Sequence, residues 1–231
     1  MKRATVVRVT WLWVMFIGAA IWAADEDWKP LFTPDLSNAD APAGVWTVRD
    51  GILTADRDEC IWTRDEYENF VLDLEFRCGP AANSGVILYC SDTRNWIPNS
   101  VEVQILDDAA PKWANVPPTW KCGGIFGRLA PRPVRIHPAG EWNRMTIYAR
   151  GPRIVVLVNG EISADMDMRK WTSANRNPDG SEAPPWLSRA PAEMPSKGRI
   201  GLQGKHGSAT IEFRNIRWRP LRPNEPIPGA N

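Results

Sequence analysis

Acidic side chains with an amide neighbour could perform acid–base chemistry in this sequence. The segment 101–106 alternates apolar and polar residues, so Glu102 and Gln104 project from one face of a strand while the valines and isoleucine project from the other. Glu75 stands at a polar position of the similarly alternating segment 70–78, and we expect the strands at 70–78, 85–90 and 101–106 to share one polar face. Two carboxylates, one acid and one base or nucleophile, commonly cleave glycosidic bonds. Glu75 and Glu102 are therefore candidate site residues, and a solvated sheet face carrying scattered charges is the alternative.

His206 lies between glycines in Gly204-Lys-His-Gly207, where a turn would leave its ring open to a ligand. A single histidine is more often structural, so the alternative is that His206 is simply part of a turn and binds no ligand. Asp107 and Asp108 follow the strand at 101–106, where a loop mouth is expected. His137 and His206 are the two imidazoles and the four cysteines lack C-x-x-C spacing, which argues against a structural zinc site.

Tryptophan is the most unusual feature of the composition, with 13 residues in the chain. Five lie in predicted loops: Trp96, Trp113, Trp120, Trp171 and Trp186. An indole presents a large flat apolar face that suits the C–H surface of a sugar ring. The alternative is that each one pins its loop to the body of the domain. For the five together, we expect at least one contact with a sugar.

Residues 1–24 have the outline of a secretory signal peptide. Lys2, Arg3 and Arg8 precede an uncharged apolar run that ends in small residues, and the run is too short to span a bilayer comfortably. We expect cleavage between Ala20 and Ala24 and a secreted or periplasmic protein. The alternative is an uncleaved N-terminal segment that would anchor the protein in the membrane.

Export would place the four cysteines in an oxidising compartment, which permits two disulfides of undetermined pairing. Buried thiols are the alternative for Cys60, Cys78, Cys90 and Cys122. Loss of the signal would shift the formal net charge from +1 to about −2. Nucleic acid is therefore not an expected partner, because its binding depends on clustered Lys and Arg.

The segments that must position these residues are predicted to be strands. Period-two alternation recurs, and no helical stripe lasts beyond about two turns, so the fold is predicted to be all-β, a sandwich, jelly roll or barrel. Asp50-Gly51 and Asn159-Gly160 predict tight hairpins. The predicted core positions are Leu72, Leu74, Phe76, Val101, Val103, Ile105, Ile211 and Phe213. Two long segments, 107–138 and 165–197, are predicted to be binding loops or lids.

Six short blocks resemble, in order, those of the 3-keto-disaccharide hydrolase (DUF1080) family. The blocks are Asn83-Ser-Gly-Val86, Val101-Glu-Val-Gln-Ile-Leu-Asp-Asp108, Gly140-Glu-Trp-Asn143, Val158-Asn-Gly160, Gly201-Leu-Gln203 with His206-Gly207, and Phe213-Arg-Asn-Ile216. The resemblance covers about residues 28–221 and implies a concanavalin-like, two-sheet antiparallel jelly-roll sandwich, here over 25–221. The proline-rich end of the chain, 222–231, is expected to be a flexible tail. It also implies activity on sugars oxidised at C3. Tyr89 departs from the family, which often has Arg there.

On this resemblance, we expect acid–base elimination at a 3-keto glycoside followed by addition of water, with Glu102 as base or acid and His206 as its partner. The expected substrate-binding residues are Glu75, Asn83, Tyr89, Gln104, Asp107, Trp113 and Lys121. No cofactor is expected, although a divalent metal held by such carboxylates is conceivable. The expected partner is a carbohydrate, and the alternative function is a non-catalytic sugar-binding module.

Overall fold

The computed structural model describes residues 27–229, so the predicted signal segment lies outside the described residues. This part of the chain is built of strands and six one-turn 3-10 helices, without an α-helix. The strands are β1 (Lys29–Pro30), β2 (Ala39–Asp40), β3 (Trp46–Arg49), β4 (Ile52–Ala55), β5 (Ile61–Tyr67), β6 (Phe70–Cys78), β7 (Asn83–Cys90), β8 (Val101–Leu106), β9 (Trp142–Arg150), β10 (Arg153–Val158), β11 (Glu161–Asp167), β12 (Gly198–Leu202) and β13 (Ile211–Pro220). The short helices are η1 (Thr93–Asn95), η2 (Ile97–Asn99), η3 (Pro111–Trp113), η4 (Pro118–Trp120), η5 (Met168–Lys170) and η6 (Pro191–Glu193).

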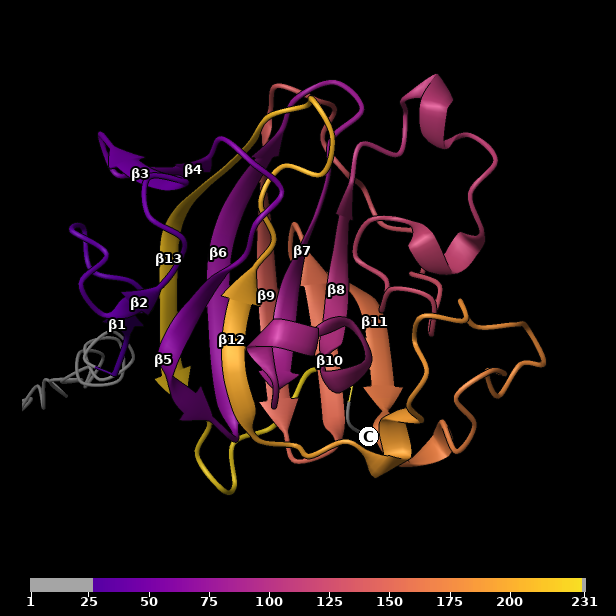
Figure 1. Ribbon diagram of the computed structural model, residues 1–231. Helices are drawn as coiled ribbons and strands as arrows, with labels where there is room; N and C mark the ends of the chain where they lie inside the picture. Colours follow the sequence, from indigo (N-terminus) through magenta and orange to yellow (C-terminus); the bar gives the residue numbers. More distant parts are fainter. Residues whose placement is uncertain (1–26, 230–231) are drawn as a thin grey trace, which may run out of the picture.

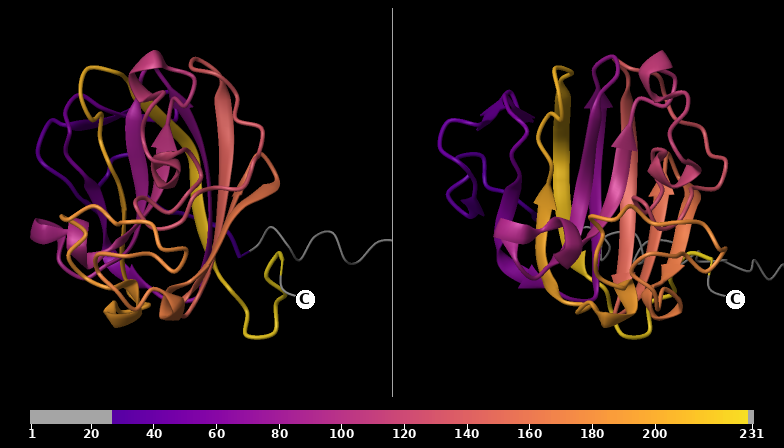
Figure 2. Two further views of the ribbon diagram at one scale, coloured as in Figure 1. Left: turned by 90° about the vertical axis from the view of Figure 1, so that its right-hand side faces the viewer. Right: turned by 45° about the vertical axis from the view of Figure 1, so that its right-hand side comes forward.

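The strands form two antiparallel sheets packed face to face (Figures 1 and 2). One sheet has eight strands in the order β11-β10-β9-β6-β13-β4-β3, with β1 added to β13. The other has five strands in the order β2-β5-β12-β7-β8. The predicted two-sheet antiparallel jelly-roll sandwich is thereby confirmed.

The core lies between the sheets and is filled by alternate residues of the strands. Leu72, Leu74 and Phe76 of β6 enter it from the larger sheet, and Val103 and Ile105 of β8 enter it from the smaller one, all fully buried. Each of the eight predicted core residues is at most 4% exposed. Alternation within a strand therefore predicted burial correctly.

Both predicted hairpin turns are confirmed. Asp50 and Gly51 join β3 to β4 with φ angles of 51° and 74°, and Asn159 and Gly160 join β10 to β11 with φ angles of 51° and 86°. Two successive positive φ values are the requirement of a type I′ turn, which Asn-Gly and Asp-Gly meet at low steric cost.

The prediction that 70–78, 85–90 and 101–106 share one polar face is wrong. Strand β6 belongs to the larger sheet, where it pairs with β9 and β13, whereas β7 and β8 pair in the smaller sheet. The turn after Cys78 carries the chain from one sheet to the other. Consequently Glu75 and Glu102 lie on opposite outer faces of the sandwich.

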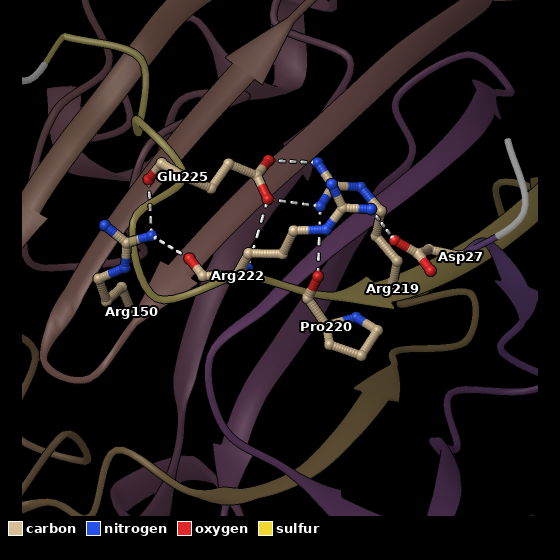
Figure 3. A network of polar contacts seen from close by, with 6 residues as sticks. All are labelled: Asp27, Arg150, Arg219, Pro220, Arg222 and Glu225. Carbon is tan, nitrogen blue, oxygen red and sulfur yellow. Dashed lines mark hydrogen bonds and ion pairs between the residues drawn. The ribbon is translucent and has the colours of Figure 1, made fainter. Parts of the chain in front are cut away.

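The two long loops lie on the same side of the sandwich, beyond β8 and β11 (Figure 1). Segment 222–229, predicted to be a flexible tail, packs against the outer face of the larger sheet, where Ile227 is 5% exposed. A polar network holds it there: Arg150 donates to the carbonyl oxygens of Arg222 and Glu225, and Arg219 pairs with the Glu225 carboxylate (Figure 3).

All four cysteines are free thiols and buried. Burial raises the pKa of Cys78 to about 12, which makes its thiol unreactive at neutral pH. In residues 27–229, no helix is long and apolar enough to cross a membrane.

Candidate functional site

The outer face of the five-stranded sheet carries a row of side chains that crosses four strands. Trp62 of β5 is opposite Gly201 of β12, Gly201 is opposite Ile87 of β7, and Ile87 is opposite Glu102 of β8. Because residues opposite each other in a sheet point to the same face, this row forms one continuous surface. Glu102 is its acidic residue.

Glycines leave space in this surface for the larger side chains. A Cβ atom at Gly85 would lie 2.2 Å from Oε1 of Glu102, and a Cβ atom at Gly201 would lie 2.5 Å from the Trp62 ring. The Glu102 carboxyl group therefore leans over Gly85, and the Trp62 indole leans over Gly201. Larger residues at either glycine would displace these groups.

The environment of Glu102 favours its protonated form. Burial of the carboxyl group, and secondarily the negative charge of Asp58, raise the pKa of Glu102 from 4.5 to about 8. A carboxyl group with such a pKa is largely protonated at neutral pH, which is the state required of a general acid. The effect of Asp58 also shows that this second carboxylate lies near the first.

Asp58 forms a pair with His206. Oδ2 of Asp58 lies 2.5 Å from Nδ1 of His206, and Oδ1 accepts a longer hydrogen bond of 3.4 Å from Nε2 of Gln203. When Asp58 is ionised it can only accept, so Nδ1 of His206 is then the donor, and in the neutral imidazole Nε2 keeps the lone pair. The pair therefore presents a potential base at Nε2.

Two chain segments must meet to form this pair. The backbone N–H of Gly204 donates to the carbonyl oxygen of Glu59 at 3.1 Å, and a Cβ atom at position 204 would lie 2.2 Å from the carbonyl oxygen of Arg57. Only glycine allows this approach. The backbone N–H of His206 also donates to the carbonyl oxygen of Asn83 at 3.2 Å, which ties the turn to β7.

Aromatic rings form the wall of the same groove. Trp62 and Trp96 pack edge to face with centroids 6.2 Å apart. The groove has a volume of about 580 Å³, and both rings line it together with Asp58, Gln203 and His206. An aromatic wall beside polar groups suits a sugar, which has apolar C–H faces and polar hydroxyls.

A larger cleft of about 830 Å³ lies on the outer face of the other sheet, and Glu75 lines it. Both of its acidic groups are paired with arginines: Arg214 donates to Glu75 at 2.6 Å, and Arg144 donates to Asp73 at 2.9 Å. The hydrogen bond from Arg214 lowers the pKa of Glu75, so this carboxylate stays ionised and is a poor acid. The smaller groove is therefore the better candidate for acid–base catalysis.

Of the nine residues predicted for the site, the structure brings Glu102 and His206 to one face, with Asn83 and Gln104 beside them. Nε2 of Gln104 donates to Oδ1 of Asn83 at 3.1 Å, and Gln104 is 1% exposed. Its Oε1 has no hydrogen-bond partner within residues 27–229. These two amides therefore support each other.

The other predicted residues lie elsewhere. Glu75 is on the opposite sheet, and Tyr89 is in the core, where its hydroxyl donates to the carbonyl oxygen of Gly151. The positive φ of Tyr89, 56°, breaks the alternation that placed it outside.

Three further predicted site residues hold the 107–138 loop in place. Asp107 accepts from the backbone N–H of Ala81, Trp113 donates its indole N–H to the carbonyl oxygen of Ala81, and Lys121 donates to the carbonyl oxygen of Trp113. These polar groups hold the 107–138 loop to the sandwich rather than facing the groove.

Asp58, Trp62 and Gln203 were missed by sequence reasoning. Trp62 lies on β5, whose exposed stretch Arg64-Asp-Glu66 interrupts the alternation and hides the strand. Asp58 precedes that strand in a charged turn that resembles any solvated loop. No local signal distinguishes it, because its importance comes from Gly204 and His206, almost 150 residues further along the chain.

A two-sheet sandwich with an acidic, tryptophan-walled groove defines a carbohydrate-active protein. A family model described as a 3-keto-alpha-glucoside-1,2-lyase-like domain matches residues 24–219, and the chain belongs to this family.

Solved structures agree with this assignment. A protein of Parabacteroides distasonis ATCC 8503, titled only provisionally as a glycosyl hydrolase, is 53% identical, with a TM-score of 0.82 over 84% of this chain and 99% of that one. A second protein of that organism with the same provisional title is 20% identical, with a TM-score of 0.71 over 85% of this chain and 95% of that one.

A Bacillus subtilis protein of unknown function with a galectin-like fold is 10% identical, with a TM-score of 0.52 over 83% of this chain and 94% of that one, and it supports the fold alone. No curated protein matches the chain.

Proposed function

We propose that the protein is an exported enzyme that cleaves 3-keto-α-glucosides at the groove lined by Asp58 and His206, with Glu102 next to it on the same face of the sheet. The family description supplies the class of substrate. The observation that carries the proposal is Glu102, an acid with its pKa raised to about 8 beside the Asp58–His206 pair. Export rests on the N-terminal sequence, which lies outside the described residues.

The chemistry follows from the ketone at C3, which acidifies the hydrogen on C2. A base takes this proton, and the electron pair of the C2–H bond forms the enolate. Collapse of the enolate breaks the bond between C1 and the leaving oxygen, and an acid gives that oxygen a proton. Addition of water across the new C1=C2 bond, with hydroxyl on C1 and hydrogen on C2, completes hydrolysis.

The two groups have complementary states for these steps. His206, oriented by Asp58, offers the lone pair of Nε2 to the C2 hydrogen. Glu102, protonated at neutral pH, offers its hydrogen to the leaving oxygen. Gln203 lines the groove with His206 and can donate to the carbonyl oxygen as negative charge develops there. Glu102 thus enters the reaction in the protonation state that its surroundings favour.

The test is Glu102→Gln, which keeps size and shape but removes the titrating proton. Turnover of 3-ketotrehalose should fall by about 10²–10⁴-fold, while affinity for unoxidised trehalose should change far less. The melting temperature checks that the variant is folded. Unchanged turnover would overturn the role of Glu102, and sugar binding without any turnover by the unmutated protein would instead identify a carbohydrate-binding module.

A further inference from the structure

Three aromatic rings gather on the two long loops. Trp120 packs against Phe126 with centroids 5.0 Å apart and against Trp186 with centroids 6.0 Å apart. Trp186 is 48% exposed and is one of two exposed large hydrophobic residues in the described chain. An indole left half in solvent beside two other rings is available for contact with a ligand.

This aromatic cluster extends the outer-face row that runs from Trp62 to Glu102. Val103 of β8 pairs with Ile125 in an isolated bridge, and the backbone N–H of Phe126 donates to the carbonyl oxygen of Glu102 at 2.9 Å. Val103 and Ile125 are opposite each other and buried in the core, so their neighbours in the chain, Glu102 and Phe126, face outward. Phe126 is therefore the neighbour of Glu102 on the outer face.

The row now has aromatic groups at both ends and the acid inside it. Glu102 is one strand spacing, about 4.8 Å, from Phe126 and three spacings, about 14 Å, from Trp62. The polar groups Asp58, Gln203 and His206 lie with Trp62 on one side of Glu102. Phe126 lies on the other side of Glu102, Trp120 packs against Phe126, and Trp186 packs against Trp120.

The loops that carry the rings are firmly held. Arg128, only 4% exposed, donates hydrogen bonds from one loop to the carbonyl oxygens of Ala174, Leu187 and Arg189 in the other, at 2.7–2.9 Å. The indole N–H of Trp171 donates back to the carbonyl oxygen of Arg128 at 3.1 Å. This framework fixes the backbone next to Trp186, and a pre-formed surface binds a ligand at lower entropic cost.

Other loop tryptophans show what an anchoring role looks like. Trp171 is 7% exposed with its N–H bonded to a backbone carbonyl, and the N–H of Trp113 is bonded in the same way. Trp186 differs from Trp171 in its exposure, because the loop leaves almost half of its surface in solvent. Anchoring of the loop does not account for that exposed face.

We propose that Trp120, Phe126 and Trp186 form a second sugar subsite, which holds the leaving sugar unit of a disaccharide. The inference rests on the proposed function, since it takes the reacting unit to lie among Glu102, Gln203 and His206. Stacking of a sugar ring on the indoles would then place the glycosidic oxygen beside the acid. The site favours substrates whose leaving group is itself a sugar.

The test measures affinity by calorimetry with two unreactive probes, trehalose and methyl α-glucoside, which lacks the second sugar. In Trp186→Ala, the dissociation constant for trehalose should rise about five- to tenfold, while that for methyl α-glucoside stays unchanged. Trp186→Phe should restore part of the trehalose affinity. Trp142→Ala, on the outer face of the other sheet, is the control and should leave both affinities unchanged.

Unchanged trehalose affinity in Trp186→Ala would overturn the subsite, as would an equal loss for both probes or a lack of trehalose binding by the unmutated protein. Melting temperatures establish that each variant is folded. Failure of the proposed reaction would be recognised separately, as selective trehalose binding without turnover of 3-ketotrehalose.

Discussion

The carboxyl group of Glu102 occupies the space that a side chain at Gly85 would fill. A Cβ atom at position 85 would lie 2.2 Å from Oε1, 2.7 Å from Cγ and 2.8 Å from Cδ of Glu102. The two residues lie on neighbouring strands, β7 and β8, and the missing side chain of one determines where the acid of the other can lie.

Gly85→Ala should therefore displace the acid without unfolding the protein, because the Glu102 side chain can rotate away. We expect a loss of about 10²-fold in turnover of 3-ketotrehalose, the scale of a misplaced catalytic group. In a Glu102→Gln background, the same change should cost little more, since the two losses share one cause. Additive losses in this double-mutant cycle would contradict the relationship.

Asp58→Asn should reduce turnover by about 10²–10⁴-fold. An amide can donate to Nδ1 of His206, which favours the tautomer that has its hydrogen on Nε2 and removes the base. The matched control is Asp40→Asn, because Asp40 lines the same groove but pairs with Arg199 at 3.0 Å. Equal losses in the two variants would show that groove charge, rather than the orientation of His206, matters.

The sequence was sufficient to predict the strands but not their partners. Alternation in 70–78 and 101–106 identified the buried positions, because burial of every second residue is a local property of a strand. Which sheet a strand joins depends on contacts far away in the sequence, so Glu75 was placed on the wrong side of the sandwich. The alternation of residues within a strand carries no information about which sheet the strand joins.

For the candidate site, too, local features were predictable from the sequence and long-range contacts were not. Glu102 and Gln104 were predictable from their strand, and His206 from the glycines around it. Asp58 was not, because its partner His206 is held by the close approach of two distant turns at Gly204. Tyr89 was misplaced because a single positive φ reverses the side to which a residue points.

The raised pKa of Glu102 should make folding stability depend on pH. Between pH 4.5 and about 8, the unfolded chain has lost the proton that the folded protein keeps, so Glu102 makes stability fall as pH rises through this window. Glu102→Gln mimics the protonated form. The free energy of unfolding of the variant should match that of the unmutated protein near pH 4 and exceed it by on the order of 5 kcal/mol at pH 9.

Urea unfolding at a series of pH values measures this difference, and comparison of the two proteins cancels the titration of all other groups. A difference in the free energy of unfolding that stays constant from pH 4 to 9 would contradict the assigned environment of Glu102.

Arg128 should stabilise both long loops. Burial lowers its pKa to about 10, so the guanidinium remains charged at neutral pH while it donates to carbonyl oxygens of residues 174, 187 and 189. Arg128→Met keeps the length of the side chain but leaves these buried carbonyls without donors. We expect a loss of about 3 kcal/mol in the free energy of unfolding, together with faster proteolysis within 173–189.

The control is Arg132→Met, which replaces an exposed arginine of the same loop and should change the free energy of unfolding by less than about 0.5 kcal/mol. Equal stability of the two variants would show that the loops are held by their apolar contacts alone.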